Sequence, residues 1–435
     1  MLPHTPTEFG VIDVQWFMNN GDVRPKTSDE PFEKRRIRRR IVELSSRHVG
    51  DRESFGGDHH PDRTLGTVDA IRSELLAARE GGWTVRTAGT AHSHYPLLPT
   101  DGVILDTRPL AGLVSVDEEA MTATFRAGTK IHACGRPLLD HGMGLLNQGD
   151  IDQQSIGGAI ATGTHGTGIN LGSFSSAVTQ LSLVLVDGSV VTCSNESEPD
   201  LFEAARLSLG AIGVVLEATI QVREAYRLEE HQWLEPLDSV MERVDELTQA
   251  TRHFEYFWWP GQDRAVCKSI DITQEPPRYP LGEEGQRLGW SFEVLPNQRL
   301  NPHTEMEYSV PSENGPSCLE EIKDLLSSHY PNVEWPIEYR TVAADDVWLS
   351  PARERPTVTI SIHEAVENDE TSYYRDAEKI FRSYGGRPHW GKVHYLTGDQ
   401  LEADYDHWTQ WWRVREDVDP TGVLLNDRLS QLRPL

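Results

Sequence analysis

The segment SIGGAIATGTHGTG (155–168) is rich in glycine and in small hydroxyl residues. Such a composition lets backbone N–H groups approach a ligand closely and form concave surfaces that bind anions. It is not a Walker loop, because no Gly-Lys-Ser/Thr follows, and its glycines do not fall between a strand and a helix at the dinucleotide-binding spacing. Taken alone, the segment predicts either a cofactor-binding loop or a cluster of glycine turns.

A second polar segment, TAGTAHSHY (87–95), follows the strand-like WTVR (83–86). It combines two histidines with a glycine and small hydroxyl residues in nine positions. The simple interpretation is a polar turn, and the alternative is an imidazole nucleophile held against a cofactor. The residues themselves do not distinguish His92 from His94 in that role.

Hydrophobic periodicity indicates α+β architecture in two parts. Residues 67–82 have a helical pattern that ends at a glycine pair, and short alternating runs at 101–107, 121–128 and 189–194 are typical of strands. From about residue 223, strand-like runs (253–260 and 357–365) are mixed with helical segments (239–252, 318–330 and 372–385). This order predicts an antiparallel sheet with helices on one face.

The composition limits the classes of partner. A net charge of −27 repels phosphates, so we expect neither nucleic acid nor an anionic membrane as a partner. The acidic surplus fits either a halophilic source or an ordinary acidic protein. Four dispersed cysteines without a CxxC predict buried free thiols and a cytoplasmic protein. We also expect neither a transmembrane span nor a secretory signal. The basic amphipathic segment 32–44 is expected to pack on the acidic body of its own chain rather than to bind nucleic acid.

Several motifs in a fixed order resemble those of known flavoproteins. TAGTAHS (87–93), SIGGAIATGTHGTG (155–168) and LGAIGVVLEATIQV (209–222) resemble the FAD-binding domain of the vanillyl-alcohol-oxidase type. IEYR (337–340), RPHWGK (387–392) and DPTGVLLN (419–426) are similar to the aldonolactone oxidases (L-gulonolactone and D-arabinono-1,4-lactone oxidases) and the alditol oxidases. The resemblance covers residues 64–435 and implies an α+β fold, with a two-part FAD-binding domain and a cap domain whose antiparallel sheet is covered by helices.

The resemblance also implies a division of the chain. Residues 61–222 are expected to form the FAD-binding domain and 223–410 the substrate-binding cap domain. Residues 411–435 are expected to pack back on the FAD-binding domain, and 1–60 form an N-terminal extension to which no role is assigned.

For the cofactor, the resemblance implies FAD bonded covalently to His92, because Ser93 follows it as in the family motif, and it leaves His94 as a turn or surface residue. Gly149 corresponds to a position near the flavin carbon that reacts with oxygen, although a tight turn explains a glycine equally well. No metal-binding set is predicted, and the pair His59–His60 is expected to be solvated. The expected cofactor-binding residues are Ala88, Gly89, Thr90, Ala91, His92, Ser93, His94, Gly149, Asp150, Ser155, Gly158, Thr162, Gly163, Thr164, His165 and Val214.

The expected catalytic residues are Glu338, Arg340, His363 and Lys392. Glu338 and Arg340 alternate on a predicted strand and therefore share a face, where they could hold a substrate hydroxyl, with the cation keeping the carboxylate ionised. An ordinary salt bridge is the simpler interpretation of that pair, and a half-exposed strand residue is the simpler interpretation of His363. Lys392 is expected to place positive charge near the flavin, and His389 is expected to be mainly structural.

The predicted function is oxidation of a carbohydrate-type alcohol (an aldonolactone, alditol or sugar) by FAD, with oxygen as acceptor and hydrogen peroxide as product. Two alternatives remain at this point: a dehydrogenase that uses a quinone or carrier protein, and an inactive flavin-fold protein that binds a partner. Asp150 stands where many relatives have a small or hydroxyl residue, so it could bind a polyol hydroxyl or repel an acidic substrate.

Overall fold

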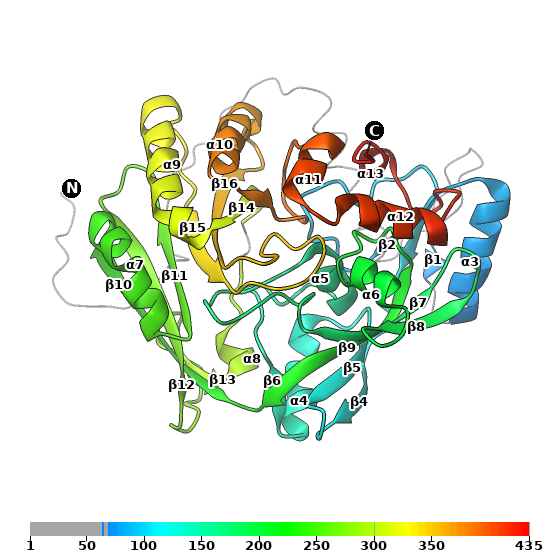
Figure 1. Cartoon of the computed structure of the whole chain (residues 1–435). Coiled ribbons are helices and arrows are strands. Elements are labelled where there is room, and N and C mark those ends of the chain that lie inside the picture. The colour runs from blue at the N-terminus through cyan, green and yellow to red at the C-terminus, as the bar shows by residue number, and fades with distance from the viewer. Residues whose placement is uncertain (1–62, 65–67, 300, 435) are drawn as a thin grey trace.

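The computed structural model describes residues 63–64, 68–299 and 301–434 (Figure 1). The predicted basic helix at 32–44 and the pair His59–His60 lie outside these ranges. Within them, none of the helices combines the length and the apolarity that a bilayer crossing requires. The four cysteines are buried free thiols, as expected.

The first part of the chain contains two sheets. A small parallel sheet has the order β1 (Arg63–Thr64), β3 (Val103–Asp106), β2 (Val85–Ala88), and α3 (Val68–Gly81) packs beside it in one hydrophobic cluster. An antiparallel sheet has the order β4 (Leu113–Asp117), β5 (Thr122–Arg126), β9 (Val214–Glu224), β7 (Val178–Val184), β8 (Val190–Ser194), and β6 (Met143–Leu145) pairs with β9. Between these strands lie η2 (Ile131–Ala133), α4 (Gly135–Asp140), α5 (Ile156–Thr162) and α6 (Pro199–Arg206).

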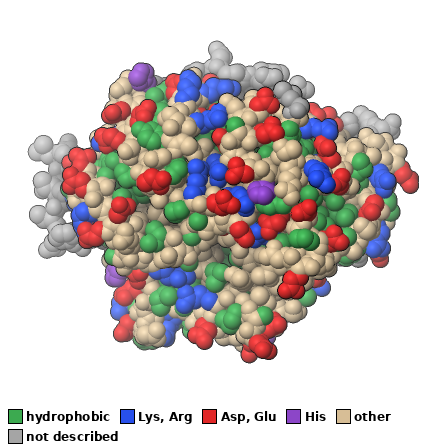
Figure 2. All heavy atoms as spheres, viewed as in Figure 1, with side chains coloured by type: hydrophobic (Ala, Val, Ile, Leu, Met, Phe, Trp, Pro, Cys, Tyr) green, Lys and Arg blue, Asp and Glu red, His purple; other side chains and the backbone are tan. Residues whose placement is uncertain are grey.

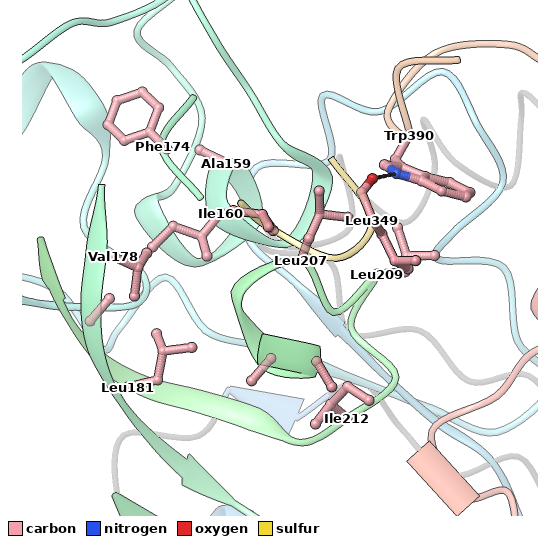
Figure 3. Close-up of a cluster of buried hydrophobic side chains, with 14 of the residues drawn as sticks. Ala159, Ile160, Phe174, Val178, Leu181, Leu207, Leu209, Ile212, Leu349 and Trp390 are labelled. Carbon is pink, nitrogen blue, oxygen red and sulfur yellow. Dashed lines mark hydrogen bonds between the residues drawn. The ribbon is translucent and has the colours of Figure 1, made fainter. Parts of the chain in front are cut away.

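The glycine-rich segment forms α5 and the loop that follows it. Ser155 is the N-cap and its hydroxyl accepts a hydrogen bond from the Gly158 amide, while Gly163 ends the helix at φ 73°, where a side chain would be strained. Ala159 and Ile160 of this helix lie in the large hydrophobic cluster, near Leu207 (Figure 3). Apolar side chains thus hold one side of α5 in the core, while Gly157 and Gly158 line a cavity.

The second part of the chain is built on an eight-stranded antiparallel sheet. Its order is β13 (Leu288–Trp290), β10 (Arg227–Pro236), β12 (Arg264–Thr273), β11 (His253–Trp258), β15 (Ile337–Val342), β16 (Thr357–Ala365), β14 (His303–Pro311), β17 (Arg387–Pro388). Three helices, α7 (Leu237–Ala250), α9 (Gly315–His329) and α10 (Thr371–Ser383), cover one face (Figure 1). The short α8 (Ser291–Val294) follows β13, and η3 (Ser312–Asn314) leads into α9. The opposite face carries charged side chains into the cavity described below. The predicted α+β fold, with a helix-covered antiparallel cap sheet, is confirmed.

The C-terminal residues return to the first part of the chain. After α11 (Gly398–Asp404) and α12 (Trp408–Val418), the Val85 amide of β2 donates to the Val423 carbonyl over 2.7 Å. Asn426, which caps α13 (Asp427–Ser430), donates to the carbonyls of Pro96, Leu97 and Pro99. The chain passes from the first antiparallel sheet to the eight-stranded sheet between the end of β9 at Glu224 and the start of β10 at Arg227. This crossing lies close to 222/223, which remains our prediction of the domain boundary.

Charge is distributed over the surface rather than concentrated. Asp and Glu side chains are spread over the face seen in Figure 2, and Lys and Arg side chains lie among them. The net charge of −27 is therefore a property of the whole chain and not of one acidic patch on this face.

Candidate active site

A cavity of about 1720 Å³ is lined by both parts of the chain. This volume exceeds the 300–1,000 Å³ usual for a small-ligand pocket, and it leaves room for a large cofactor together with a substrate. All predicted catalytic residues and most predicted cofactor residues line it. Ala88, Gly163 and Val214 do not: they lie in β2, at the end of α5 and at a buried position at the start of β9.

The turn at residues 89–94 lies directly against the start of α5. A Cβ atom added to Gly89 would meet the Ser155 hydroxyl oxygen at 2.0 Å, so only a glycine fits here without displacement. Ala91 has φ 56°, and the His94 amide donates to the Gly391 carbonyl over 2.7 Å. The turn is thus fixed between the glycine-rich segment and RPHWGK, and its backbone borders the cavity.

The two histidines of this turn have different surroundings. The His92 side chain borders the open cavity, and desolvation by the protein atoms around it, together with the charges of Lys392 and Lys130, lowers its pKa, so its imidazole is neutral at neutral pH. His94 lies in the turn, one of the two places expected for it, and it is half-buried. Its Nε2 lies 4.0 Å from the Glu305 carboxylate, and burial is the main cause of a pKa well below the ordinary value.

The close contact of Gly89 gives a first prediction. Replacement of Gly89 by alanine should displace the turn from Ser155 and lower the flavin content of the purified protein, measured as absorbance at the flavin band relative to 280 nm. Gly144→Ala is the matched control, because a Cβ atom there meets its nearest neighbour at an ordinary 3.5 Å. Equal flavin content in the two variants would contradict the placement of the turn at the cofactor.

Glu338 and Arg340 lie side by side on β15 and both are buried. The Arg340 Nη2 atom is 3.3 Å from the Glu338 carboxylate. Burial nevertheless raises the pKa of Glu338 to about 8, against the opposing effect of Arg340. The expectation that Arg340 keeps Glu338 ionised is therefore wrong at neutral pH, because desolvation outweighs the nearby cation.

Arg340 pairs with Glu307 as well as with Glu338. Glu307 lies on a second strand with acidic residues, which the sequence analysis missed. On β14, His303, Glu305 and Glu307 alternate and so share one face. The Glu307 carboxylate accepts hydrogen bonds from Arg340, from the Ser361 hydroxyl at 2.7 Å and from His165 Nε2 at 2.8 Å. The signal in the sequence is the alternation within HTEMEY (303–308), which predicts that these three polar residues project from one side of a strand.

The sheet register brings these groups into one row. Ser361 on β16 pairs with Glu338 on one side and with Glu307 on the other. His165 completes the group from the glycine-rich segment: its Nδ1 faces the Gly166 carbonyl at 2.9 Å and its Nε2 faces Glu307, so both ring nitrogens face oxygen acceptors. A cap-domain carboxylate is thereby joined directly to the loop that was predicted to bind the cofactor.

Glu305 lies beside the two remaining predicted catalytic residues, Lys392 and His363. Its carboxylate accepts a hydrogen bond from Lys392, and it pairs in register with His363, whose Nε2 lies 3.8 Å away. His363 is buried rather than half-exposed. Its Nδ1 contacts the Pro336 carbonyl at 2.7 Å, and burial lowers its pKa to about 4, so the ring is neutral.

Trp390 fixes the RPHWGK segment in place. It is fully buried, and its indole N–H donates to the Leu349 carbonyl over 2.7 Å (Figure 3). The neighbouring His389 is also buried; its Nδ1 accepts from the Gly391 amide at 3.0 Å, and burial lowers its pKa to about 3. These contacts fit the structural role predicted for His389 and position Lys392 at the cavity.

Asp150 belongs to an ion-pair network in the cavity wall. Its carboxylate accepts hydrogen bonds from Asn297 and from Arg299 at 2.8 Å, and the Lys268 ammonium lies 3.7 Å away. These cations lower the pKa of Asp150 despite its burial. The charge of the Asp150 carboxylate is thus largely balanced by protein groups. This weakens both roles that its sequence position suggested, which were to bind a polyol hydroxyl or to repel an acidic substrate.

Comparisons with known proteins agree with this geometry. An FAD-binding-domain family model matches residues 63–194, and the D-arabinono-1,4-lactone oxidase family model matches residues 218–290 and 279–432. The L-gulono-1,4-lactone dehydrogenase of Mycobacterium tuberculosis is 35% identical over 401 residues, which cover 83% of this chain and 93% of that protein. The L-gulonolactone oxidase of Mus musculus is 29% identical (84% and 93% covered), and the alditol oxidase of a Streptomyces species is 27% identical (83% and 92% covered).

Solved structures support the fold. The cholesterol oxidase of B. sterolicum superposes with a TM-score of 0.75 at 17% identity, covering 85% of this chain and 93% of that one. A chitooligosaccharide oxidase superposes with a TM-score of 0.68 at 12% identity, covering 91% and 99%. With the family matches and the site described above, the chain belongs to the D-arabinono-1,4-lactone oxidase family and is an FAD-dependent oxidoreductase of the vanillyl-alcohol-oxidase type that acts on CH–OH groups.

Proposed function

We propose that this protein is an oxidase of a carbohydrate-type alcohol, namely an aldonolactone, an alditol or a sugar, with FAD attached through His92 and oxygen as the electron acceptor. The observation that carries the proposal is the convergence of Glu338, Arg340, His363 and Lys392, from separate segments of the cap, on the cavity that also exposes His92. The relatives named as lactone and alditol oxidases support the substrate class.

The residues present fit FAD. The cavity is bordered by a turn whose Gly89 has no room for a Cβ atom and by the glycines that open α5, so backbone N–H groups can approach a diphosphate. His92 faces the same cavity as a neutral imidazole, which is the form that can act as a nucleophile toward the cofactor. When bound, FAD would supply the acceptor for the hydride that leaves the substrate carbon.

The cap residues would handle the proton and the charge of the substrate hydroxyl. The Glu338 carboxylate, once ionised, can accept the hydroxyl proton, and a pKa near 8 is suited to a base that works close to neutral pH. The Arg340 guanidinium beside it can stabilise the negative charge that then develops on the substrate oxygen. Glu307 holds that guanidinium in position, and Glu305 does the same for the Lys392 ammonium.

Neutral His363 completes the substrate side of the cavity. Because its Nδ1 contacts a backbone carbonyl, its Nε2 bears the lone pair and can accept a hydrogen bond from a second substrate hydroxyl. A polyol or lactone presents several hydroxyls in a row, which suits a wall that offers carboxylate and imidazole acceptors side by side.

The test is anaerobic mixing of the purified yellow protein with a panel of alditols, aldoses and aldonolactones, followed by exposure to air. We expect at least one member of the panel to bleach the flavin absorbance and air to restore it with release of hydrogen peroxide. If no compound bleaches the flavin, the proposed substrate class is wrong. If a compound bleaches it but air restores it slowly while a quinone restores it fast, the protein is a dehydrogenase.

The dehydrogenase alternative has a specific basis, since the 35% identical relative is named a dehydrogenase. Gly149 offers a prediction on this point. A Cβ atom there would lie 3.1 Å from the His165 carbonyl oxygen, which is tight but requires only a small shift. We expect Gly149→Ala to slow reoxidation of the reduced flavin by oxygen while an artificial acceptor such as ferricyanide restores it as fast as before; stopped-flow absorbance measures both rates. Unchanged reoxidation by oxygen would remove Gly149 from the acceptor path.

A further inference from the structure

Two histidines and a carboxylate meet at one point of the cavity wall, although no metal-binding set was evident in the sequence. His94 comes from the turn at 89–94, while His303 and Glu305 come from β14. The Nε2 atoms of His94 and His303 lie 4.0 Å and 3.8 Å from the same oxygen of Glu305, and the donor atoms of the three residues lie within 4.8 Å of one another. These separations are too long for hydrogen bonds. They exceed the roughly 3.4 Å between ligand atoms that share a tetrahedral ion at bonds of about 2.1 Å, so the three side chains would close on the ion by about half an ångström or more.

The tautomer of His303 favours a cation over a hydrogen bond to Glu305. His303 Nδ1 contacts the Asn301 carbonyl at 2.9 Å, and because a carbonyl can only accept, this nitrogen carries the proton. In the neutral ring the Nε2 atom then presents its lone pair toward Glu305. Such a backbone carbonyl behind the ring is the usual outer support of a histidine that ligates a metal.

The charge balance of the wall points the same way. Among the described residues, its cationic side chains are Arg86, Arg299, Arg340 and Lys392, and each already binds protein oxygen atoms. The carboxyl groups in the same wall outnumber them. A cavity with surplus carboxylates and no uncommitted cation in its described wall attracts cations from solution.

We propose that His94, His303 and Glu305 form a binding site for a divalent transition-metal ion of the Zn²⁺ type. Two imidazoles and one carboxylate are a ligand set that Zn²⁺ accepts, with a fourth position open to water. The Lys392 ammonium now binds the Glu305 oxygen that the metal would take, so the metal and the lysine compete for it and Lys392 must move away when the metal binds. Since Lys392 is one of the proposed catalytic residues, bound metal should also inhibit the reaction; only this consequence rests on the proposed function.

The experiment is equilibrium dialysis of the flavin-loaded protein against ZnCl₂, with bound zinc measured by atomic absorption. We expect one Zn²⁺ per chain. His303→Ala should weaken binding by at least about 100-fold, because loss of an outer-shell partner alone costs ~10–100-fold. Lys392→Met should tighten binding by at least about tenfold, because it removes the competing charge a few ångströms from the metal. The control is His231→Ala on β10, whose side chain is 63% exposed and lies outside the cavity wall; it should bind zinc like the unaltered protein.

Any of three results would overturn the proposal: no zinc bound by the unaltered protein, equal zinc binding by His303→Ala, or no tightening in Lys392→Met. The opposite signs expected for His303→Ala and Lys392→Met separate a real site from general loss of folding, which can only weaken binding. The dialysis needs no substrate, so a protein that binds zinc but bleaches with no polyol or lactone would refute the proposed function and leave the metal site standing.

Discussion

Replacement of His92 by alanine should abolish covalent flavin attachment, whereas the unaltered chain keeps its flavin through acid denaturation. The physical reason is that a neutral imidazole faces the open cavity at this point of its wall, where desolvation by the surrounding protein and two lysines lower the pKa of His92. The measurement is yellow fluorescence of the polypeptide band on a denaturing gel soaked in acid. We expect the signal to fall from full to background, because no other bond of this kind is proposed.

His94→Ala is the control, since His94 lies two residues away in the same turn and lines the same cavity, but its Nε2 faces Glu305 at 4.0 Å. It should keep the fluorescent band. Flavin that is released by acid from both the unaltered chain and His94→Ala would refute the covalent bond. A fluorescent band that persists in His92→Ala would show that the flavin is attached to another residue. To check that His92→Ala has folded, the flavin content of the native variant is measured. Flavin that is bound without a covalent bond shows that the variant is folded.

Sequence reasoning succeeded where the signal is local. The alternation of Glu338 and Arg340 predicts one shared face, and the structure places both on β15 with their charged atoms 3.3 Å apart. The segments 239–252, 318–330 and 372–385 were expected to be helices because their apolar residues recur at helical spacing, and α7, α9 and α10 lie there. The family motifs added the order of the site segments, which no periodicity could supply.

It failed where the answer depends on partners far along the chain. Glu305 and Glu307 have an ordinary strand alternation in the sequence, and their importance appears only when β14 pairs with β16. The ionisation of Glu338 was misjudged for the same reason. A sequence shows that an arginine is two residues away, but it does not show that the arginine is shared with a second carboxylate or that the pair is buried. Desolvation and long-range pairing decide pKa values, and neither is a local property.

The second large effect is expected for Glu338→Gln. If the Glu338 carboxylate accepts the substrate proton, its removal should lower kcat/KM by about 10²–10⁴-fold, the usual contribution of a general base. The pH profile provides a sharper test. Because only the ionised form can accept a proton and the pKa is raised to about 8, kcat/KM of the unaltered protein should rise about tenfold per pH unit below pH 8 and level off above it. Glu338→Gln should lose this limb, which steady-state rates between pH 5 and 10 would show.

Stability should change with pH in the opposite sense to activity. The pKa of Glu338 is higher in the folded chain than its ordinary value of 4.5, so its contribution to stability is fully present below that value and is lost as the pH rises through about 8. Glu338→Gln should therefore melt at a higher temperature than the unaltered protein at pH 9, even though it is much less active. Glu334→Gln, an exposed change four residues earlier, should keep both the activity and the pH profile. A Glu338→Gln variant that retains the limb near pH 8 would show that another group of the cavity is the base. Loss of the limb together with a gain in stability at high pH would support a buried Glu338 carboxyl group that ionises at the site of reaction.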